Sequence, residues 1–130
     1  MTSTATRRTL QPAGVPQTFY PQGVEVSGAQ RMVFVSGQVG TDDDGHWLDG
    51  VEAQTRQVIA RLTAVLAAAD LGLDDLVKIT IYLTDPADYE PFLAVAGELI
   101  GQPRFTVTGL VVPFLSDPAQ KVEIEAIAVA

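Results

Sequence analysis

The chain has 130 residues, the length of one folded domain, and its 47% hydrophobic and 18% charged residues exclude an intrinsically disordered protein. Eight basic residues against sixteen acidic ones give a formal net charge of -8, which disfavours binding to nucleic acids and anionic membranes. No cysteine is present, which excludes disulfides, thiolate nucleophiles and cysteine-ligated metal sites.

The first part of the chain predicts an irregular segment followed by short strands. We expect one domain over residues 1–130, with residues 1–16 irregular. That segment has no apolar leader region, and no apolar run is long enough to span a membrane, so we expect a cytoplasmic protein. The segments VEVSG and RMVFVSG predict two strands that form a hairpin through the turn Ser27-Gly28. A turn at Asp44-Gly45 leads to a third short strand, HWL.

The middle and end of the chain alternate between helical and strand patterns. Apolar residues three and four apart from Val51 predict an amphipathic helix ending near Gly72, and the alternation from Val77 to Leu83 predicts a strand. Asp85-Pro86 predicts the start of a second helix that ends at Gly101. Two strands follow, at residues 105–112 and 122–129. The order β-β-β-α-β-α-β-β indicates an α+β fold.

Two helices cover only one face of such a sheet, so the other face needs a different cover. Alternation fixes the side of each residue only within its own strand, so we assume how the strands face one another. A group of polar residues then shares the uncovered face: Lys78, Thr80, Tyr82, Arg104, Thr106, Thr108, Glu123 and Glu125. Self-association would bury this mixed face around pockets. We therefore predict a homo-oligomer.

Arg104, Glu123 and Glu125 are the residues with the strongest chemical interest. The planar guanidinium of Arg104 could hold a carboxylate through two parallel hydrogen bonds. Alternatively, Arg104 is a surface cation or pairs with Glu123 or Glu125. The two glutamates project to the same side of the last strand, where they could take part in proton transfer or belong to a solvated edge strand.

Other candidate residues have simpler interpretations. His46, the only histidine, lies in the turn TDDDGHW, which predicts a solvated side chain. The aspartates of that turn do not fit a calcium loop, since Gly40 and Val51 stand where acidic ligands are required. Ser36 lacks the glycine pattern of a hydrolase nucleophile, and Tyr20 by itself is an aromatic residue near the start of a strand. We predict no metal site.

Six segments together resemble, in their order and spacing, the signature blocks of the RidA (YjgF/YER057c/UK114) family: YPQGV from Tyr20, VSGQ from Val35, QTRQ from Gln54, LVKIT from Leu76, RFTV from Arg104 and VEIEAIA from Val122. The resemblance covers nearly the whole chain. It implies the chorismate-mutase-like α+β fold and a homotrimer in which the sheets pack together with the helices outside.

The resemblance also implies an activity: the hydrolytic deamination of reactive enamine and imine intermediates, such as 2-aminoacrylate, to 2-keto acids and ammonia without a cofactor. Arg104 matches the arginine that binds the substrate carboxylate, and Glu123 matches the glutamate that positions the attacking water. Three residues match pocket positions, namely Tyr20, Ser36 and Thr106. Phe105, where the family commonly has a small residue, is expected to contact the substrate. In this family the sites form between neighbouring subunits.

Two other functions remain open from the sequence. The chain could be a noncatalytic trimer that binds a small carboxylate metabolite at Arg104 and has a regulatory role. Ribonuclease activity, known for some relatives, conflicts with the acidic charge of this chain. The connection PFLSDPAQK, which ends two residues before Glu123, is longer than the usual one in the family.

Overall fold

The structure, a computed structural model, describes residues 4–130. The order of elements is β-β-β-α-β-α-β-β, as predicted from the sequence, but the three strands before α1 are not the three that were expected. Short 3-10 turns precede β4 and α2 at Leu73–Asp75 and Pro86–Asp88. Their bounds are β1 Thr6–Leu10, β2 Gly23–Ser27, β3 Met32–Val39, α1 Gly50–Ala67, β4 Leu76–Leu83, α2 Tyr89–Ile100, β5 Thr106–Val111 and β6 Val122–Val129.

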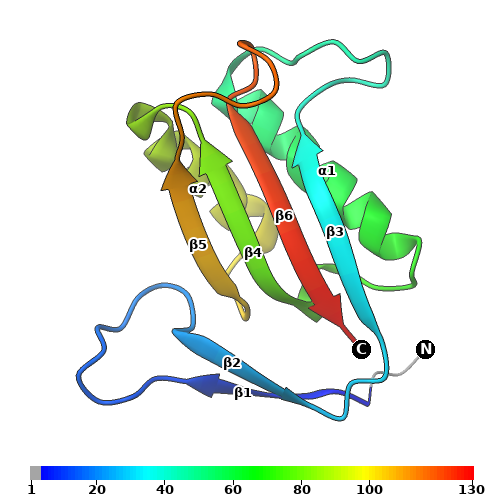
Figure 1. Cartoon of the computed structure of the whole chain (residues 1–130), viewed down its shortest axis with the longest axis vertical. Helices are drawn as coiled ribbons and strands as arrows, with labels where there is room; N and C mark the ends of the chain where they lie inside the picture. Colours follow the sequence, from blue (N-terminus) through cyan, green and yellow to red (C-terminus); the bar gives the residue numbers. More distant parts are fainter. Residues whose placement is uncertain (1–3) are drawn as a thin grey trace.

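The expected hairpin between VEVSG and RMVFVSG is wrong. β2 pairs with β1 in a separate two-stranded antiparallel sheet, and β3 pairs with β6 (Figure 1). Gly28, with a φ of +72°, turns the chain after β2, and the N–H groups of Gln30 and Arg31 both donate to the carbonyl of Ala130. The chain therefore enters β3 beside the end of β6 and does not fold back on β2.

Two further expectations about the early segments are wrong. Residues 6–10, expected to be irregular, form β1, whose sequence TRRTL gives no apolar alternation by which to recognise a strand. The third short strand expected at HWL is reduced to an isolated bridge between Thr41 and Trp47. The three strands before α1 are therefore β1, β2 and β3, and HWL is not one of them.

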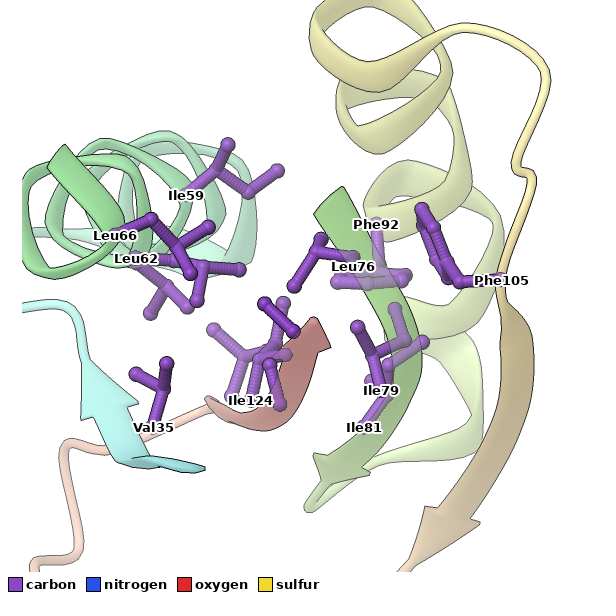
Figure 2. Packing of buried hydrophobic residues seen from close by; sticks show 14 of the residues in the cluster. Val35, Ile59, Leu62, Leu66, Leu76, Ile79, Ile81, Phe92, Phe105 and Ile124 are labelled. Carbon is purple, nitrogen blue, oxygen red and sulfur yellow. The ribbon is translucent and has the colours of Figure 1, made fainter. Parts of the chain in front are cut away.

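The main sheet has the strand order β3-β6-β4-β5, in which β4 and β5 are parallel and the other pairs antiparallel. Both helices lie behind this sheet, whereas the hairpin of β1 and β2 lies beyond one end of it (Figure 1). The core forms between the helices and the sheet, where side chains of α1 such as Leu62 and Leu66 meet Ile124 of β6 (Figure 2). The α+β fold with two helices on one face is confirmed.

The end signal for the second helix acts as predicted, whereas the start signal caps the 3-10 turn Pro86–Asp88 and α2 itself begins at Tyr89. The carboxylate of Asp85 accepts a hydrogen bond from the N–H of Ala87 at 2.9 Å, and Pro86 follows as the first residue of the turn. Gly101 ends α2 with a φ of +75°, a conformation that glycine adopts without steric cost. Among the described residues, neither helix is long and apolar enough to cross a membrane.

The register confirms the polar face. Lys78 pairs with Thr106, and Thr80 pairs with both Thr108 and Glu125. Tyr82 pairs with Glu123, so both glutamates of β6 belong to the face opposite the helices. Because β6 lies between β3 and β4, the alternative of a solvated edge strand for these glutamates is wrong.

The packing of α1 predicts that alanine substitutions at two positions of this helix lower the free energy of unfolding by very different amounts. Leu62 is 1% exposed inside the core, whereas Val65 is 38% exposed. Leu62→Ala should lower the free energy of unfolding by about 2–5 kcal/mol, because it removes buried methyl groups and leaves a cavity. Val65→Ala should change it by about 0.5 kcal/mol or less. Denaturant unfolding measures both, and equal losses would contradict this placement of the core.

Candidate functional site

Glu123 lies in the middle of the open sheet face, near the end where β6 begins. Its Oε1 accepts a hydrogen bond of 3.0 Å from Nε2 of Gln120. Its Oε2 lies over Gly37 of β3, so closely that a Cβ added to Gly37 would come within 2.1 Å of that oxygen. The carboxylate therefore occupies space on the neighbouring strand that only a glycine leaves free.

Ser36 lies on the same face, beside the centre of the sheet. It lines a shallow cavity of about 270 Å³ together with Lys78, Thr80 and Glu125. The Tyr82 hydroxyl donates a hydrogen bond of 3.0 Å to Oε1 of Glu125. The two glutamates of β6 thus have different partners, Gln120 for Glu123 and Tyr82 for Glu125.

Arg104 lies at the other end of the sheet, just before β5 begins. Its side chain is exposed and has no hydrogen bond or ion pair with any part of residues 4–130, so the pairing with Glu123 or Glu125 considered from the sequence is wrong. Arg7 of β1 donates to the backbone carbonyls of Leu76 and Arg104. Burial, and next the positive charge of Arg104, lower the pKa of Arg7, while Asp75 and Asp74 act in the opposite direction. Arg7 is thus engaged by backbone carbonyls and lies near two carboxylates, so the exposed guanidinium of Arg104 is the group at this end of the sheet that can attract an anion.

Tyr20 is brought to the same end of the molecule as Arg104. The side-chain amide of Gln102, two residues before Arg104, donates to the carbonyl of Phe19, and the rings of Phe19 and Tyr20 meet edge to face with centroids 4.8 Å apart. Tyr20 and Phe19 line an apolar cavity of about 360 Å³ between α2 and the sheet.

The two residues after Arg104 point to opposite faces. Phe105 is buried on the helix side, where it lines the apolar cavity with Tyr20 (Figure 2). Thr106 lies on the open face beside Lys78, and its hydroxyl donates to the carbonyl of Val77 at 3.2 Å. Phe105 and Thr106 therefore serve different surfaces within one chain.

Within one chain, the candidate residues form two groups at opposite ends of the sheet. Arg104 precedes Thr106, which pairs with Lys78, whereas Glu123 pairs with Tyr82 further along β4. At roughly 3.3 Å per residue this places the backbones of Arg104 and Glu123 about 20 Å apart along the strand direction. The first group contains Arg104 and Thr106, with Tyr20 at the same end but on the helix side, and the second contains Glu123. Ser36 lies between the two groups on the open face, beside Lys78 and Glu125.

The acidic turn has a structural explanation. Ligand atoms of Asp42, Asp44 and His46 lie within 4.8 Å of one another. However, Oδ1 of Asp42 accepts hydrogen bonds from the backbone N–H groups of Asp44 and His46, as expected for an aspartate that caps its own turn. These bonds lower the pKa of Asp42, and the bond from the backbone N–H of His46 has the largest effect. The His46 side chain is 79% exposed, which confirms the solvated turn histidine.

Three residues that lie near the candidate groups were not predicted from the sequence to belong to a site. Gln120 lies in the connection before β6, Gly37 follows Ser36, and Arg7 belongs to the unrecognised strand β1. The length of the connection 113–121 was the one available signal for Gln120. No sequence pattern indicates that its amide meets a glutamate, because that contact depends on the path of the connection.

The contact between Tyr82 and Glu125 predicts an observable titration. The hydrogen bond to Glu125 is the main cause that raises the pKa of Tyr82 above 10.0, followed by burial and the negative charges of Glu125 and Glu123. The acceptor carboxylate favours the protonated phenol. In Glu125→Gln the pKa of Tyr82 should therefore fall toward its ordinary value. Alkaline ultraviolet titration, with Tyr82→Phe to assign the absorbance change, measures this shift, and an unchanged titration would contradict the contact.

Comparisons with known proteins identify the family. The family model described as Endoribonuclease L-PSP matches residues 12–130. Protein mmf2, mitochondrial, of Schizosaccharomyces pombe is 38% identical over 113 residues, covering 84% of this chain and 86% of that protein. A Rid-family protein of unknown function, YyfB from Yersinia pestis, is similar in structure with a TM-score of 0.83 and 27% identity, covering 95% of this chain and 98% of that one. Escherichia coli TdcF, solved with bound serine, has a TM-score of 0.70 and 31% identity, covering 92% of each chain. This protein belongs to the RidA family.

Proposed function

We propose that this protein hydrolyses the imine and enamine forms of 2-amino acids, of the 2-aminoacrylate type, to 2-keto acids and ammonia. The observation that carries this proposal is the Arg104 guanidinium, which is exposed at the end of the sheet and unpaired within residues 4–130. A free guanidinium suits a carboxylate, which it can bind through two parallel hydrogen bonds. TdcF, a relative solved with bound serine, supports a small ligand that carries a carboxylate.

We propose that three chains assemble through their open faces, which brings Arg104 of one chain to Glu123 of the next. The separation of these residues within one chain is the reason, because neither group alone combines a carboxylate-binding cation with a proton acceptor. The open face carries exposed apolar side chains that such an assembly would cover, namely Met32, Phe34 and Leu110, which are 59%, 70% and 42% exposed. Burying them provides the hydrophobic contribution to association.

The chemistry needs little from the protein. The enamine first takes a proton at carbon to give the iminium form, whose central carbon is electrophilic. Arg104 holds the substrate carboxylate, and Glu123 accepts a proton from a water molecule as its oxygen attacks that carbon. Glu123 then gives this proton to the nitrogen of the carbinolamine. As the C–N bond breaks and the C=O bond forms, Glu123 accepts the proton of the carbinolamine hydroxyl, so a 2-keto acid and ammonia leave and the proton is released to solvent. Tyr20, Ser36 and Thr106 are proposed to shape the surrounding pocket. Phe105, which is 3% exposed and belongs to the core on the helix side, does not contact the substrate in this arrangement, contrary to the expectation from the sequence.

The same residues would serve a noncatalytic trimer that binds a carboxylate metabolite and acts in regulation. Glu123 distinguishes the two functions. A carboxylate beside the binding site opposes an anionic ligand, which is a disadvantage for a protein that only binds, whereas a hydrolase needs this carboxylate as a proton acceptor. Cleavage of RNA, the activity in the description of the family model, is a weaker candidate for this chain. Its net charge of -8 repels a phosphate backbone.

Loss of the Arg104 side chain should abolish most of the activity. Arg104→Ala should lower kcat/KM about ten- to a hundredfold, because a hydrogen bond to a charged group contributes about 1.5–3 kcal/mol. The assay measures ammonia or pyruvate release in the presence of an enzyme that generates 2-aminoacrylate. Arg56→Ala is the matched control, since Arg56 pairs with Glu98 between the helices and its loss removes the same charge.

Three outcomes of this assay are informative. Equal rates with and without the wild-type protein would contradict the proposed deaminase. Saturable binding of a 2-keto acid without any such acceleration would instead support the noncatalytic trimer. An Arg104→Ala variant as active as wild type would remove Arg104 from the site.

Mixing two inactive variants tests the intersubunit site directly. Arg104→Ala and Glu123→Gln chains, co-expressed with different tags, should recover about one quarter of the wild-type activity. In randomly mixed trimers that share of sites joins an intact Arg104 to an intact Glu123 of its neighbour. Sedimentation should show trimers for all proteins. Activity that does not exceed that of the separate variants would contradict a site shared between chains.

A further inference from the structure

The carboxylate of Glu123 is held from two sides. Nε2 of Gln120 donates to its Oε1 at 3.0 Å, and Oε2 lies against the backbone of Gly37. Within residues 4–130, Oε2 has no hydrogen-bond donor. One oxygen of Glu123 is therefore occupied and the other is free to accept a proton.

The orientation of the Gln120 amide is fixed by its other contacts. Gln120 is 1% exposed, and its Oε1 accepts hydrogen bonds from the backbone N–H of Ser116 at 3.0 Å and from the Ser116 hydroxyl at 2.6 Å. Rotating the amide by half a turn would place NH₂ against the Ser116 N–H and a carbonyl oxygen against the Glu123 carboxylate. Both contacts would be repulsive in a buried site. The amide nitrogen consequently faces Glu123.

The backbone that carries Gln120 is anchored as well. Gln54 of α1, also 1% exposed, donates to the carbonyls of Leu48 and Ala119 at 2.9 and 2.8 Å and accepts from the N–H of Lys121 at 2.8 Å. These bonds attach the residues on both sides of Gln120 to the first helix. Buried amides with all their groups satisfied are rigid, because any displacement leaves a polar atom without a partner.

We propose that Gln120 is a positioning residue for Glu123: it holds Oε1 so that Oε2 is directed to the water that attacks the imine. This inference rests on the proposed function. It also gives the long connection 113–121 a role, since this segment supplies both the amide and the serine that orients it. A shift of about 1 Å in a reacting group can cost a hundredfold in rate, so a fixed carboxylate has a measurable advantage.

The test compares four variants in the imine-hydrolysis assay. Gln120→Met keeps the length of the side chain and suits the buried site, but donates no hydrogen bond. Gly37→Ala leaves Gln120 intact and moves the same carboxylate from its other side, through the added Cβ. Glu123→Gln sets the value for a lost acceptor. Asp117→Ala is the matched control, because Asp117 bonds Ala119 in the same connection and its carboxylate does not touch the Gln120 amide.

Gln120→Met and Gly37→Ala should each lower kcat about tenfold or more, with an unchanged KM, because the carboxylate of the substrate is held by Arg104. Adding Gln120→Met to Glu123→Gln should cause little further loss, since both act on one group. Asp117→Ala should keep the wild-type kcat. A purely structural Gln120 would lower thermal stability without this split between kcat and KM.

The results separate this inference from the proposed function. If the wild-type protein is active and both Gln120→Met and Gly37→Ala keep its kcat, the positioning role is refuted and the deaminase stands. An equal loss in Asp117→Ala also refutes it, because the effect then belongs to the whole connection. If the wild-type protein does not accelerate imine hydrolysis, the proposed function fails and this inference fails with it.

Discussion

The central position of β6 is the constraint on which the core and the candidate site both depend. β6 lies between β3 and β4, so its alternate residues must serve two different environments. Val122, Ile124, Ala126 and Ala128 are buried against the helices, while Glu123 and Glu125 belong to the open face. Two carboxylates in the middle of a sheet need hydrogen-bond partners or solvent. Glu123 accepts a hydrogen bond from the Gln120 amide, and Glu125 accepts one from the Tyr82 hydroxyl. These contacts leave the charges available for chemistry.

Two buried glutamines connect the scaffold with the open face. Gln54 belongs to a core-facing helix, where an apolar residue would be the usual choice, and it uses its whole amide to fasten the connection before β6. Gln120 lies in the fastened segment and reaches Glu123. Such a network specifies one arrangement of a long connection more strictly than apolar contacts would, because hydrogen bonds are directional.

The distribution of charge gives the two ends of the sheet different roles. Arg7 and Arg104 lie where β5 begins, with Asp74 and Asp75 near Arg7, and the Arg104 guanidinium is exposed and unpaired within residues 4–130. Glu123 lies at the opposite end. In the proposed function the substrate carboxylate binds at the first end and the proton acceptor comes from the second, so the proposed catalysis depends on assembly. The proposed trimer thus links the uncovered sheet face to the chemistry.

The sequence by itself determined the two helices, the alternating strands and that Glu123 and Glu125 share one side of the last strand, because helical spacing and strand alternation are local properties. The register of β6 with β4 decided that this side is the open face. The resemblance to the RidA family, also read from the sequence, proved correct. Only the tertiary structure decided the pairing of β1 with β2, since TRRTL carries no apolar pattern and its register depends on a distant strand. The tertiary structure also decided that Arg104 lies far from Glu123 and that Gln120 lies next to Glu123. Strand order and the path of a connection fix these distances, and the local spacing of residues along the chain predicts neither of them.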